Sequence, residues 1–480
     1  MTQNDPHSAV FAGVALLDAQ RAAQNHEGTP SARLRMDRLS RAIDLLVTHK
    51  SDYQQALSAD FGHRSPDFTA FADVATSINA LRHARKHVKS WMRPSRRALE
   101  FPLGLTGASG RIEYQPKGVV GIMAPWNFPL NLMFVPLAGA LAAGNRVLMK
   151  PSEFTPATSA LTARLIAQSF APQEVSVITG DVATGAAFSA LALDHLVFTG
   201  STAVGRHVMR AAAENLVPVT LELGGKSPVI IGASADLQMA ATRIMHGKIF
   251  NAGQICIAPD YVLLSKDQQA KFAAAAEKAV DQMFPGGLRD NPDYTSILNQ
   301  AHYDRMQDYL RDARDKGANI IELNPKSEDF AQQPHHKLPP TLILGATDDM
   351  AVMQQEIFGP LLPVRDCPDT AAAIQYVNAH PRPLALYFFG RSRREEYDVL
   401  SQTVSGGVTV NDTIMHISQD NLPFGGVGPS GMGRYHGTDG FREFSHQKAV
   451  FRQMQPDLLR FLRPPYGRAF RAYLKTLVKR

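Results

Sequence analysis

The chain has 480 residues, of which 44% are hydrophobic and 20% are charged. One hydrophobic core rarely supports such a length, so two to four domains are expected, and the ordinary composition excludes disordered and fibrous proteins. The net charge of +6 is concentrated near the C-terminus, so the body is close to neutral and the charge does not indicate nucleic-acid binding.

Compartment and metal content follow from the cysteines, the N-terminus and the histidines. Cys256 and Cys367 are too few for a disulfide framework and fit a reducing compartment. The N-terminus has no basic segment ahead of an apolar stretch, and VFAGVALL is too short to span a bilayer. We therefore expect a cytoplasmic protein. The 16 histidines show no metal-ligand spacing, so no metal is expected.

The predicted elements change in character along the chain. Up to Trp91 the apolar residues recur at three- and four-residue spacing, which predicts helices. From Arg111, short β-branched runs alternate with Ala- and Leu-rich stretches, which predicts a doubly wound α/β domain with ligands at the carboxyl ends of its strands. A second alternation after residues 218–232 predicts a second α/β domain. The expected strands are GVVGIM, RVLMK, EVSVIT and HLVFTG, then DYVLLS, PTLIL, LLPVRD and LALYFFG.

Two motifs place polar side chains after strands of the first domain. In APWNFPL, Asn127 stands among aromatic residues and prolines. It is a candidate donor to a developing oxyanion, or it closes a turn through its own side chain. LMKPSEFTP offers Lys150, Ser152 and Glu153. A carboxylate there suits ribose hydroxyls, and the alternative is a solvated turn.

A glycine motif lies between a predicted strand and a predicted helix. In FTGSTAVG, Gly200 and Gly205 are five positions apart, with Ser201 and Thr202 between them. Backbone N–H groups at such a turn can hold a phosphate. A helix-capping loop without a ligand has the same pattern.

Two glutamates and a cysteine follow in the second half. Glu222 ends an apolar strand, where burial would raise its pKa toward that of a general base, unless it is a surface residue of an edge strand. Glu356 stands beside Ile357 and Phe358. Cys256 lies in NAGQICIAPD, which indicates a helix ending in a tight loop. It is either a nucleophile or a small apolar core residue.

Six motifs, in this order, resemble the aldehyde dehydrogenase superfamily from about Leu34 to His446. Glu222 and Cys256 are 34 positions apart, as in that family. GQICIAPDYVL and NDTIMH are similar to its class 3 branch, and ISQDNLPFGGVG with NPDYTSI is most similar to bacterial coniferyl aldehyde dehydrogenases. Ile255 departs from the polar residue usual before the cysteine. The motifs are APWNFPL, LMKPSEFTP, FTGSTAVG, VTLELGGKSP, NAGQICIAPD and QQEIFGPLLPV.

The resemblance implies oxidation of an aldehyde to a carboxylic acid with NAD(P)+. Cys256 would attack the aldehyde carbon, Asn127 and the Cys256 backbone N–H would hold the oxyanion, and Glu222 would activate water to hydrolyse the thioester. Coniferyl aldehyde, giving ferulate, is the expected substrate, and a long- or medium-chain aliphatic aldehyde is the alternative. Two alternatives belong to other classes of protein. One is a cysteine hydrolase that needs no cofactor, and the other is a binding protein that has lost activity.

The resemblance also implies a cofactor site. Lys150 and Glu153 would hold the adenosine ribose, and Glu153 would repel a 2′-phosphate, which favours NAD+ while Lys150 leaves NADP+ open. Glu356 would hold the nicotinamide ribose. The cofactor-binding residues expected are Trp126, Lys150, Ser152, Glu153, Gly200, Ser201, Gly205, Leu223, Glu356 and Phe358.

The fold implied is a Rossmann-type cofactor domain with a second α/β catalytic domain and a small oligomerisation arm. The expected partners are a small aldehyde and a second copy of the chain in a homodimer. The basic tail, with its aromatic residues, suits a partner subunit and, as a less favoured reading, an anionic membrane surface. The expected ranges are 1–221 with 412–438 for the cofactor domain, 222–411 for the catalytic domain, 100–116 with 439–457 for the arm, and 458–480 for the tail.

Overall fold

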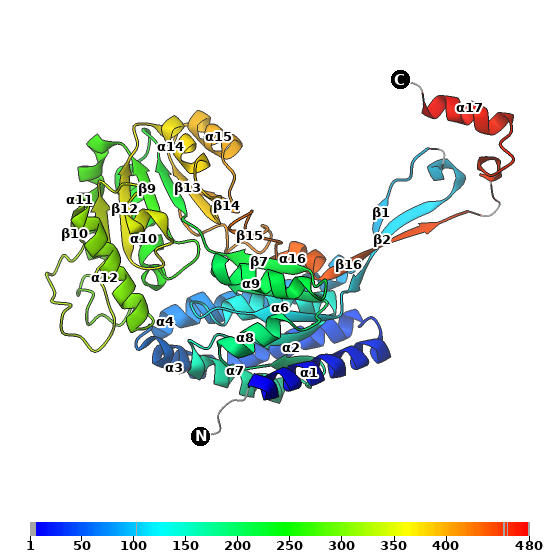
Figure 1. Cartoon of the computed structure of the whole chain (residues 1–480), viewed down its shortest axis with the longest axis horizontal. Coiled ribbons are helices and arrows are strands. Elements are labelled where there is room, and N and C mark those ends of the chain that lie inside the picture. Colours follow the sequence, from blue (N-terminus) through cyan, green and yellow to red (C-terminus); the bar gives the residue numbers. More distant parts are fainter. Residues whose placement is uncertain (1–5, 102, 455–456, 458, 479–480) are drawn as a thin grey trace.

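The computed structural model describes residues 6–101, 103–454, 457 and 459–478, and these residues form three sheets (Figure 1). Residues 1–5 of the expected cofactor domain lie outside the described residues. So do Leu458, Lys479 and Arg480 of the expected tail. None of the described helices combines the length and the hydrophobicity that a membrane span needs.

The helical character up to Trp91 is confirmed. Ser31 caps the second helix by accepting a hydrogen bond from the Leu34 N–H at 3.3 Å. The long helical pattern after it breaks at His49, whose φ of −102° and ψ of 21° separate two helices. These elements are α1 (Pro6–Glu27), α2 (Ala32–Thr48), α3 (Lys50–Phe61), α4 (Pro66–Thr69), the π-helix η1 (Ala70–Ala75) and α5 (Thr76–Trp91).

The first sheet has the strand order β15-β7-β6-β3-β4-β5, and all its pairs are parallel except that of β15 with β7. Alternate side chains of β3 point to opposite faces: Val120 and Ile122 pack with α6, and Val119 and Met123 pack with α8 and α9. The elements are β3 (Val119–Met123), β4 (Arg146–Lys150), β5 (Val175–Val177), β6 (His195–Gly200), β7 (Val219–Leu223), β15 (Gly431–Met432), α6 (Asn131–Ala143), α7 (Pro156–Ser169), α8 (Val182–Ser189) and α9 (Thr202–Ala213).

The second sheet has the order β10-β11-β12-β9-β8-β13-β14, with only β10 antiparallel among the described strands. It lies beside the first sheet, and its helices are shown in green and yellow in Figure 1. The elements are β8 (Pro228–Ile231), β9 (Tyr261–Leu264), β10 (Asn319–Glu322), β11 (Thr341–Leu344), β12 (Leu361–Asp366), β13 (Ala385–Phe389), β14 (Gly407–Val410), α10 (Leu237–Ile249), η3 (Phe250–Gly253), α11 (Lys266–Met283), α12 (Gln300–Asp315), α13 (Ala351–Gln354), α14 (Thr370–Asn378) and α15 (Arg393–Gln402).

A three-stranded antiparallel sheet projects from the body and carries α17 at its far end (Figure 1). We call it the arm. Its central strand pairs with the last strand from Ser445 opposite Pro116 to Arg452 opposite Ser109. Its first strand begins at Ser95, before the expected start of the arm at residue 100. The elements are β1 (Ser95–Arg97), β2 (Ser109–Pro116), β16 (Ser445–Arg452), η2 (Leu103–Thr106), α16 (Gly437–Glu443), η4 (Arg460–Leu462) and α17 (Arg468–Leu477).

Candidate active site

The segment before Cys256 is a helix end followed by a tight loop, as the sequence predicts. Helix α10 ends at Ile249, and Asn251 and Ala252 both have φ of 52°, in the left-handed region. Gly253 has φ of 75°, and a Cβ atom there would lie 2.2 Å from the carbonyl oxygen of Gly359. The close approach of this backbone therefore requires glycine.

A cavity of about 170 Å³ contains Cys256 and lies between the carboxyl ends of strands β6 and β7 and residues of the second sheet's domain. Strand ends of this kind are where ligands bind in doubly wound folds. Nine of the residues predicted for the site line this cavity. The lining residues are Pro125, Trp126, Asn127, Leu132, Thr199, Gly200, Ser201, Glu222, Leu223, Gly224, Cys256, His302, Arg305, Glu356 and Phe358.

The Cys256 thiol is partly buried and has two carboxyl groups nearby. Burial raises its pKa, and the charges of Glu356 and Glu222 raise it further. The thiol form is therefore favoured in the protein alone. A positive charge bound in the same cavity would favour the reactive thiolate.

Glu222 is 2% exposed, and neither carboxyl oxygen has a hydrogen-bond partner among the described residues. Burial raises its pKa well above the ordinary value. Strand β7 pairs with β6 on one side and with β15 on the other, so Glu222 is not a surface residue of an open edge. A buried carboxyl group with free oxygens is suited to take a proton from a water molecule near neutral pH.

Asn127 is 3% exposed and lies in the loop between β3 and α6. Its side-chain Nδ2 donates to the Gln254 carbonyl at 3.1 Å. The amide nitrogen carries two hydrogens, so one N–H remains for a ligand in the cavity. This hydrogen bond also ties the Asn127 loop to the segment that carries Cys256.

Glu356 and Phe358 lie on the loop between α13 and β12. Burial raises the pKa of Glu356 to about 8, and its Oε1 has no partner among the described residues. A Cβ atom at Gly224 would lie 2.0 Å from Glu356 Oε2, so the carboxyl group packs on a bare glycine backbone. The Phe358 ring meets that of Trp126 edge-on, with centroids 5.3 Å apart.

The residues expected to hold the adenosine end of a dinucleotide lie at the end of β4. Lys150 Nζ is 3.2 Å from Glu153 Oε2 and also donates to the carbonyls of Pro151 and Gly180. The buried Ser152 hydroxyl accepts from the Phe154 N–H at 3.2 Å. None of Lys150, Ser152 and Glu153 is among the described residues that line the cavity.

The glycine motif forms the turn from β6 into α9. Ser201 caps α9 by accepting from the Val204 N–H at 3.3 Å. Gly200 and Ser201 line the cavity beside this helix N-terminus, where N–H groups favour anions. Gly205 is buried one turn into the helix, and a Cβ there would lie 2.5 Å from Leu223. It allows close packing of helix and strand.

Sequence reasoning missed His302 and Arg305, which line the cavity from α12. The ring centroids of His302 and Trp126 are 5.1 Å apart. Burial and the charge of Arg305 lower the pKa of His302 to about 4. Arg305 Nη2 donates to the Ile357 carbonyl at 3.2 Å, next to Glu356. The three-residue spacing places both side chains on one helix face. It does not indicate which face meets the cavity.

The two cysteines have different surroundings, and both are free. Cys367 is buried, and its sulfur donates to the Asp369 carbonyl at 3.4 Å. It is a structural residue, as the sequence indicates, whereas Cys256 faces the cavity with Glu222 and Asn127.

Comparisons with known proteins agree with the motifs. The aldehyde dehydrogenase family model matches residues 11–450. A probable coniferyl aldehyde dehydrogenase of Caulobacter vibrioides is 56% identical, over 99% of this chain and 98% of that protein. The coniferyl aldehyde dehydrogenase of a Pseudomonas species is 51% identical, over 96% of this chain and 95% of that protein.

Solved structures agree as well. The substrate-bound AldH of Staphylococcus aureus superposes with a TM-score of 0.91 at 35% identity, over 97% of this chain and 99% of that one. The predicted α/β fold and the predicted resemblance are thus confirmed. A family model that spans almost the whole chain, and relatives that share about half of its residues, show that the chain belongs to the aldehyde dehydrogenase family.

Proposed function

We propose that this enzyme oxidises coniferyl aldehyde to ferulate with NAD(P)+. The observation that carries the chemistry is that a thiol, an unpartnered buried carboxyl group and a fixed amide line one cavity: Cys256, Glu222 and Asn127. The names of the relatives at 56% and 51% identity support the substrate.

The first step is addition of Cys256 to the aldehyde, after its thiol has released a proton to solvent water. The sulfur of the Cys256 thiolate forms a bond with the aldehyde carbon, and the carbonyl π electrons move to oxygen. The free N–H of Asn127 and the Cys256 backbone N–H stabilise the resulting oxyanion. A dinucleotide held by Glu356, Gly200 and Ser201 would supply the acceptor for the hydride that leaves the substrate carbon. A thioester on Cys256 remains.

Glu222 carries out the second half of the reaction. Its carboxylate takes a proton from water while the water oxygen forms a bond with the thioester carbon. The carbon–sulfur bond then breaks, which releases the carboxylic acid and restores the thiolate. The buried, unpartnered oxygens of Glu222 support this role because nothing in the described part of the chain competes for the proton.

The residues present fit a dinucleotide. The unpartnered Oε1 of Glu356 suits a nicotinamide ribose hydroxyl, and the bare backbone at Gly224 leaves room beside it. Gly200 and Ser201, at the N-terminus of α9, suit the pyrophosphate. Gly205 supports that turn through its packing on Leu223.

At the other end, Lys150, Ser152 and Glu153 suit the adenosine ribose, and Trp126, Leu223 and Phe358 suit the nicotinamide. Glu153 would repel a 2′-phosphate, which favours NAD+ over NADP+. Its ion pair with Lys150 weakens that repulsion.

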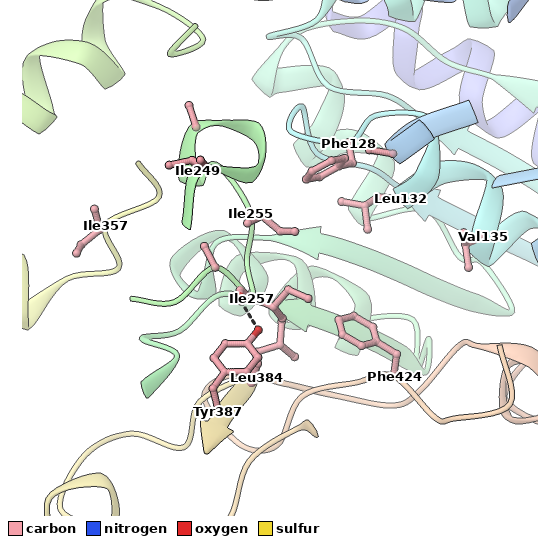
Figure 2. Close-up of a cluster of buried hydrophobic side chains, with 14 of the residues drawn as sticks. Phe128, Leu132, Val135, Ile249, Ile255, Ile257, Ile357, Leu384, Tyr387 and Phe424 are labelled. Carbon is pink, nitrogen blue, oxygen red and sulfur yellow. Dashed lines mark hydrogen bonds between the residues drawn. The ribbon is translucent and has the colours of Figure 1, made fainter. Parts of the chain in front are cut away.

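Apolar side chains around Cys256 support an apolar or aromatic substrate. Figure 2 shows Phe128, Leu132 and Phe424 on the same side of the segment that carries Ile255 and Ile257. Ile255 is 7% exposed and adds an apolar side chain directly before Cys256. An aromatic enal and an aliphatic aldehyde both suit such surroundings, so the choice between them is made by experiment.

Reduction of NAD+ and NADP+ is measured with coniferaldehyde, benzaldehyde and decanal, in the parent and in Cys256→Ala, with Cys367→Ala as the control. We expect turnover that favours coniferaldehyde, is lost in Cys256→Ala and persists in Cys367→Ala. Preference for decanal would contradict the proposal that coniferyl aldehyde is the substrate. Activity that survives in Cys256→Ala, or that needs no cofactor, would overturn the mechanism.

We also propose a homodimer that forms through the arm in a reducing, cytoplasmic setting that suits a free nucleophilic thiol. The arm carries Phe101, Phe451 and Leu477, which are 71%, 51% and 59% exposed. Several large apolar side chains exposed on one projecting element indicate an interaction surface.

Sedimentation analysis tests the dimer, and we expect a mass about twice the 52.4 kDa of one chain. Substitution of Phe451 by Glu should shift the enzyme toward the monomer, and Glu in place of the exposed Val182 on α8 is the control. A monomeric parent contradicts the dimer. Flotation of the parent with anionic vesicles would favour a membrane surface as the partner of the arm.

A further inference from the structure

A fully buried ion pair lies beside the active site, outside the machinery described above. Arg64, between α3 and α4, and Asp73, in the π-helix η1, are both 0% exposed, and Arg64 Nη2 lies 2.6 Å from Asp73 Oδ2. Removing two charges from water costs about as much free energy as their attraction returns, so such a pair is weak evidence of a role in stability alone. Its contacts indicate another role.

Both members of the pair bind the Asn127 loop, residues 124–130. Asp73 Oδ1 accepts hydrogen bonds from the backbone N–H groups of Leu130 and Asn131, each at 3.1 Å. These groups lie at the start of α6, where N–H groups lack partners within the helix. Arg64 Nη1 donates to the Asn127 carbonyl at 3.3 Å. The pair therefore fixes the loop at the residue that carries the amide and again where the loop enters α6.

Aromatic rings fix the guanidinium in turn. Its central carbon lies 4.9 Å from the ring centroid of Phe61, 5.0 Å from that of Phe68 and 5.2 Å from that of Phe128. Cation–π contacts of this kind are favourable at such distances and restrict the position of the charge. Phe128 belongs to the Asn127 loop itself, so Arg64 contacts two successive residues of that loop.

The opposite side of the loop is bound by the Cys256 segment. Asn251 Nδ2 donates to the Asn127 carbonyl at 3.2 Å, and Asn127 Nδ2 donates to the Gln254 carbonyl at 3.1 Å. Arg64 and Asn251 thus donate to the same carbonyl oxygen from two elements. The Asn127 amide is held between the N-terminal helices and the loop of the nucleophile.

We infer that Arg64 and Asp73 are positioning residues, which set the distance and direction of the Asn127 amide relative to the Cys256 sulfur. This inference rests on the oxyanion role proposed for Asn127. A donor stabilises a developing oxyanion only if it is aimed in advance, and a shift of about 1 Å can cost a hundredfold in rate. The π-helix is consistent with this role, because π turns occur frequently at functional sites and this one presents Asp73 inward.

Arg64→Lys is the most direct test. Lysine keeps a positive charge opposite Asp73, but its single ammonium group cannot reproduce the fork that binds Asp73 and the Asn127 carbonyl together. With coniferaldehyde we expect kcat to fall about tenfold or more. The KM for NAD+ and the rate at which iodoacetamide alkylates Cys256 should stay within about twofold, because alkylation forms no oxyanion and so needs no donor from Asn127.

A double-mutant cycle with Asn127→Ala separates positioning from general damage. If Arg64 acts through the amide, Arg64→Lys should lower kcat no further once the amide is gone. Asp73→Asn, which keeps an acceptor for Leu130 and Asn131 but loses the charge, should behave in the same way. Fold losses that multiply in the double variant would overturn the inference.

The matched control is Arg38→Lys. Arg38 is 2% exposed and donates to Glu174 at 2.9 Å, so it is an equally buried ion-pair arginine on α2 that binds a residue just before β5. We expect its kcat to match that of the parent. An equal loss of kcat in Arg38→Lys, or no loss of kcat in Arg64→Lys, would overturn this inference and leave the oxyanion role of Asn127 standing. An unchanged kcat in Asn127→Ala would overturn the oxyanion role and this inference together.

Discussion

The surroundings of Glu222 differ from those of an ordinary, solvated glutamate. Both oxygens lack partners in the described part of the chain, and burial raises the pKa. If Glu222 activates the hydrolytic water, Glu222→Gln should still form the thioester. One equivalent of NADH should then appear in a burst, with steady turnover lowered by about 10²–10⁴-fold.

Stopped-flow absorbance measures the burst and the steady rate separately. Glu113→Gln, in the arm, is the control and should behave as the parent. A Glu222→Gln variant without a burst would assign the residue to the first half of the reaction instead.

The raised pKa of Glu356 makes stability depend on pH. Its pKa is about 8 in the folded protein and 4.5 as the ordinary value. Between these values the folded state holds a proton that the unfolded state has lost. The free energy of unfolding therefore falls as pH rises through this window, by at most about 1.4 kcal/mol per pH unit from this group.

Denaturant titrations from pH 5 to pH 8 measure this slope. Glu356→Gln has no proton to lose at this position, so its slope should be less negative than that of the parent. Equal slopes in the two proteins would contradict a raised pKa for Glu356. Glu113→Gln again serves as the control.

The sequence predicts most inner strands of both large sheets, whereas the edge strands β10, β14 and β15 are not among the predicted runs. The runs RVLMK and HLVFTG match β4 and β6 residue for residue, because buried parallel strands are continuous β-branched and apolar stretches. The arm strands are predicted only through the family resemblance, since SGRIEYQP is half-exposed along its length. The pairing of this strand with residues 445–452 joins distant parts of the chain, so no local sequence pattern predicts it.

Some site residues can likewise be predicted from the sequence, and others cannot. Cys256, Glu222 and Asn127 lie in motifs at strand ends or helix ends, where spacing and residue type indicate chemistry. Arg64 and Asp73 have no such motif, because their role depends on which loop packs against them. Long-range packing of this kind cannot be predicted from one sequence.

The tight loop before Cys256 requires glycine at position 253. Gly253→Ala would place a Cβ 2.2 Å from the Gly359 carbonyl in a left-handed conformation. We expect the free energy of unfolding to fall by about 1–3 kcal/mol, and kcat to fall with it because Cys256 and Glu356 shift together. Denaturant unfolding and NADH formation measure the two effects. Gly286→Ala, which meets no atom within 4 Å, is the control, and an equal effect there would contradict this argument.

The cavity joins two α/β units, of which only the second is built from one continuous stretch of the chain. The second sheet is built from one uninterrupted stretch, from Pro228 in β8 to Val410 in β14. The first sheet is completed by β15, in which Gly431 pairs with Glu222. The arm likewise needs β16 to cover β2. The first sheet and the arm are therefore completed by strands that come later in the sequence than the whole second sheet.

Because the first sheet is discontinuous in sequence, the two units can be completed at different times during synthesis on the ribosome. Domains fold as they emerge, at about 5–20 residues per second. The second unit is complete while the first still lacks β15, so the edge of β7, including Glu222, stays uncovered until Gly431 is available. An open strand edge is a site of aggregation. Premature termination between residues 410 and 430 would thus yield a chain whose second unit is complete but whose first unit is incomplete and prone to aggregate. We expect chaperones to bind such a chain.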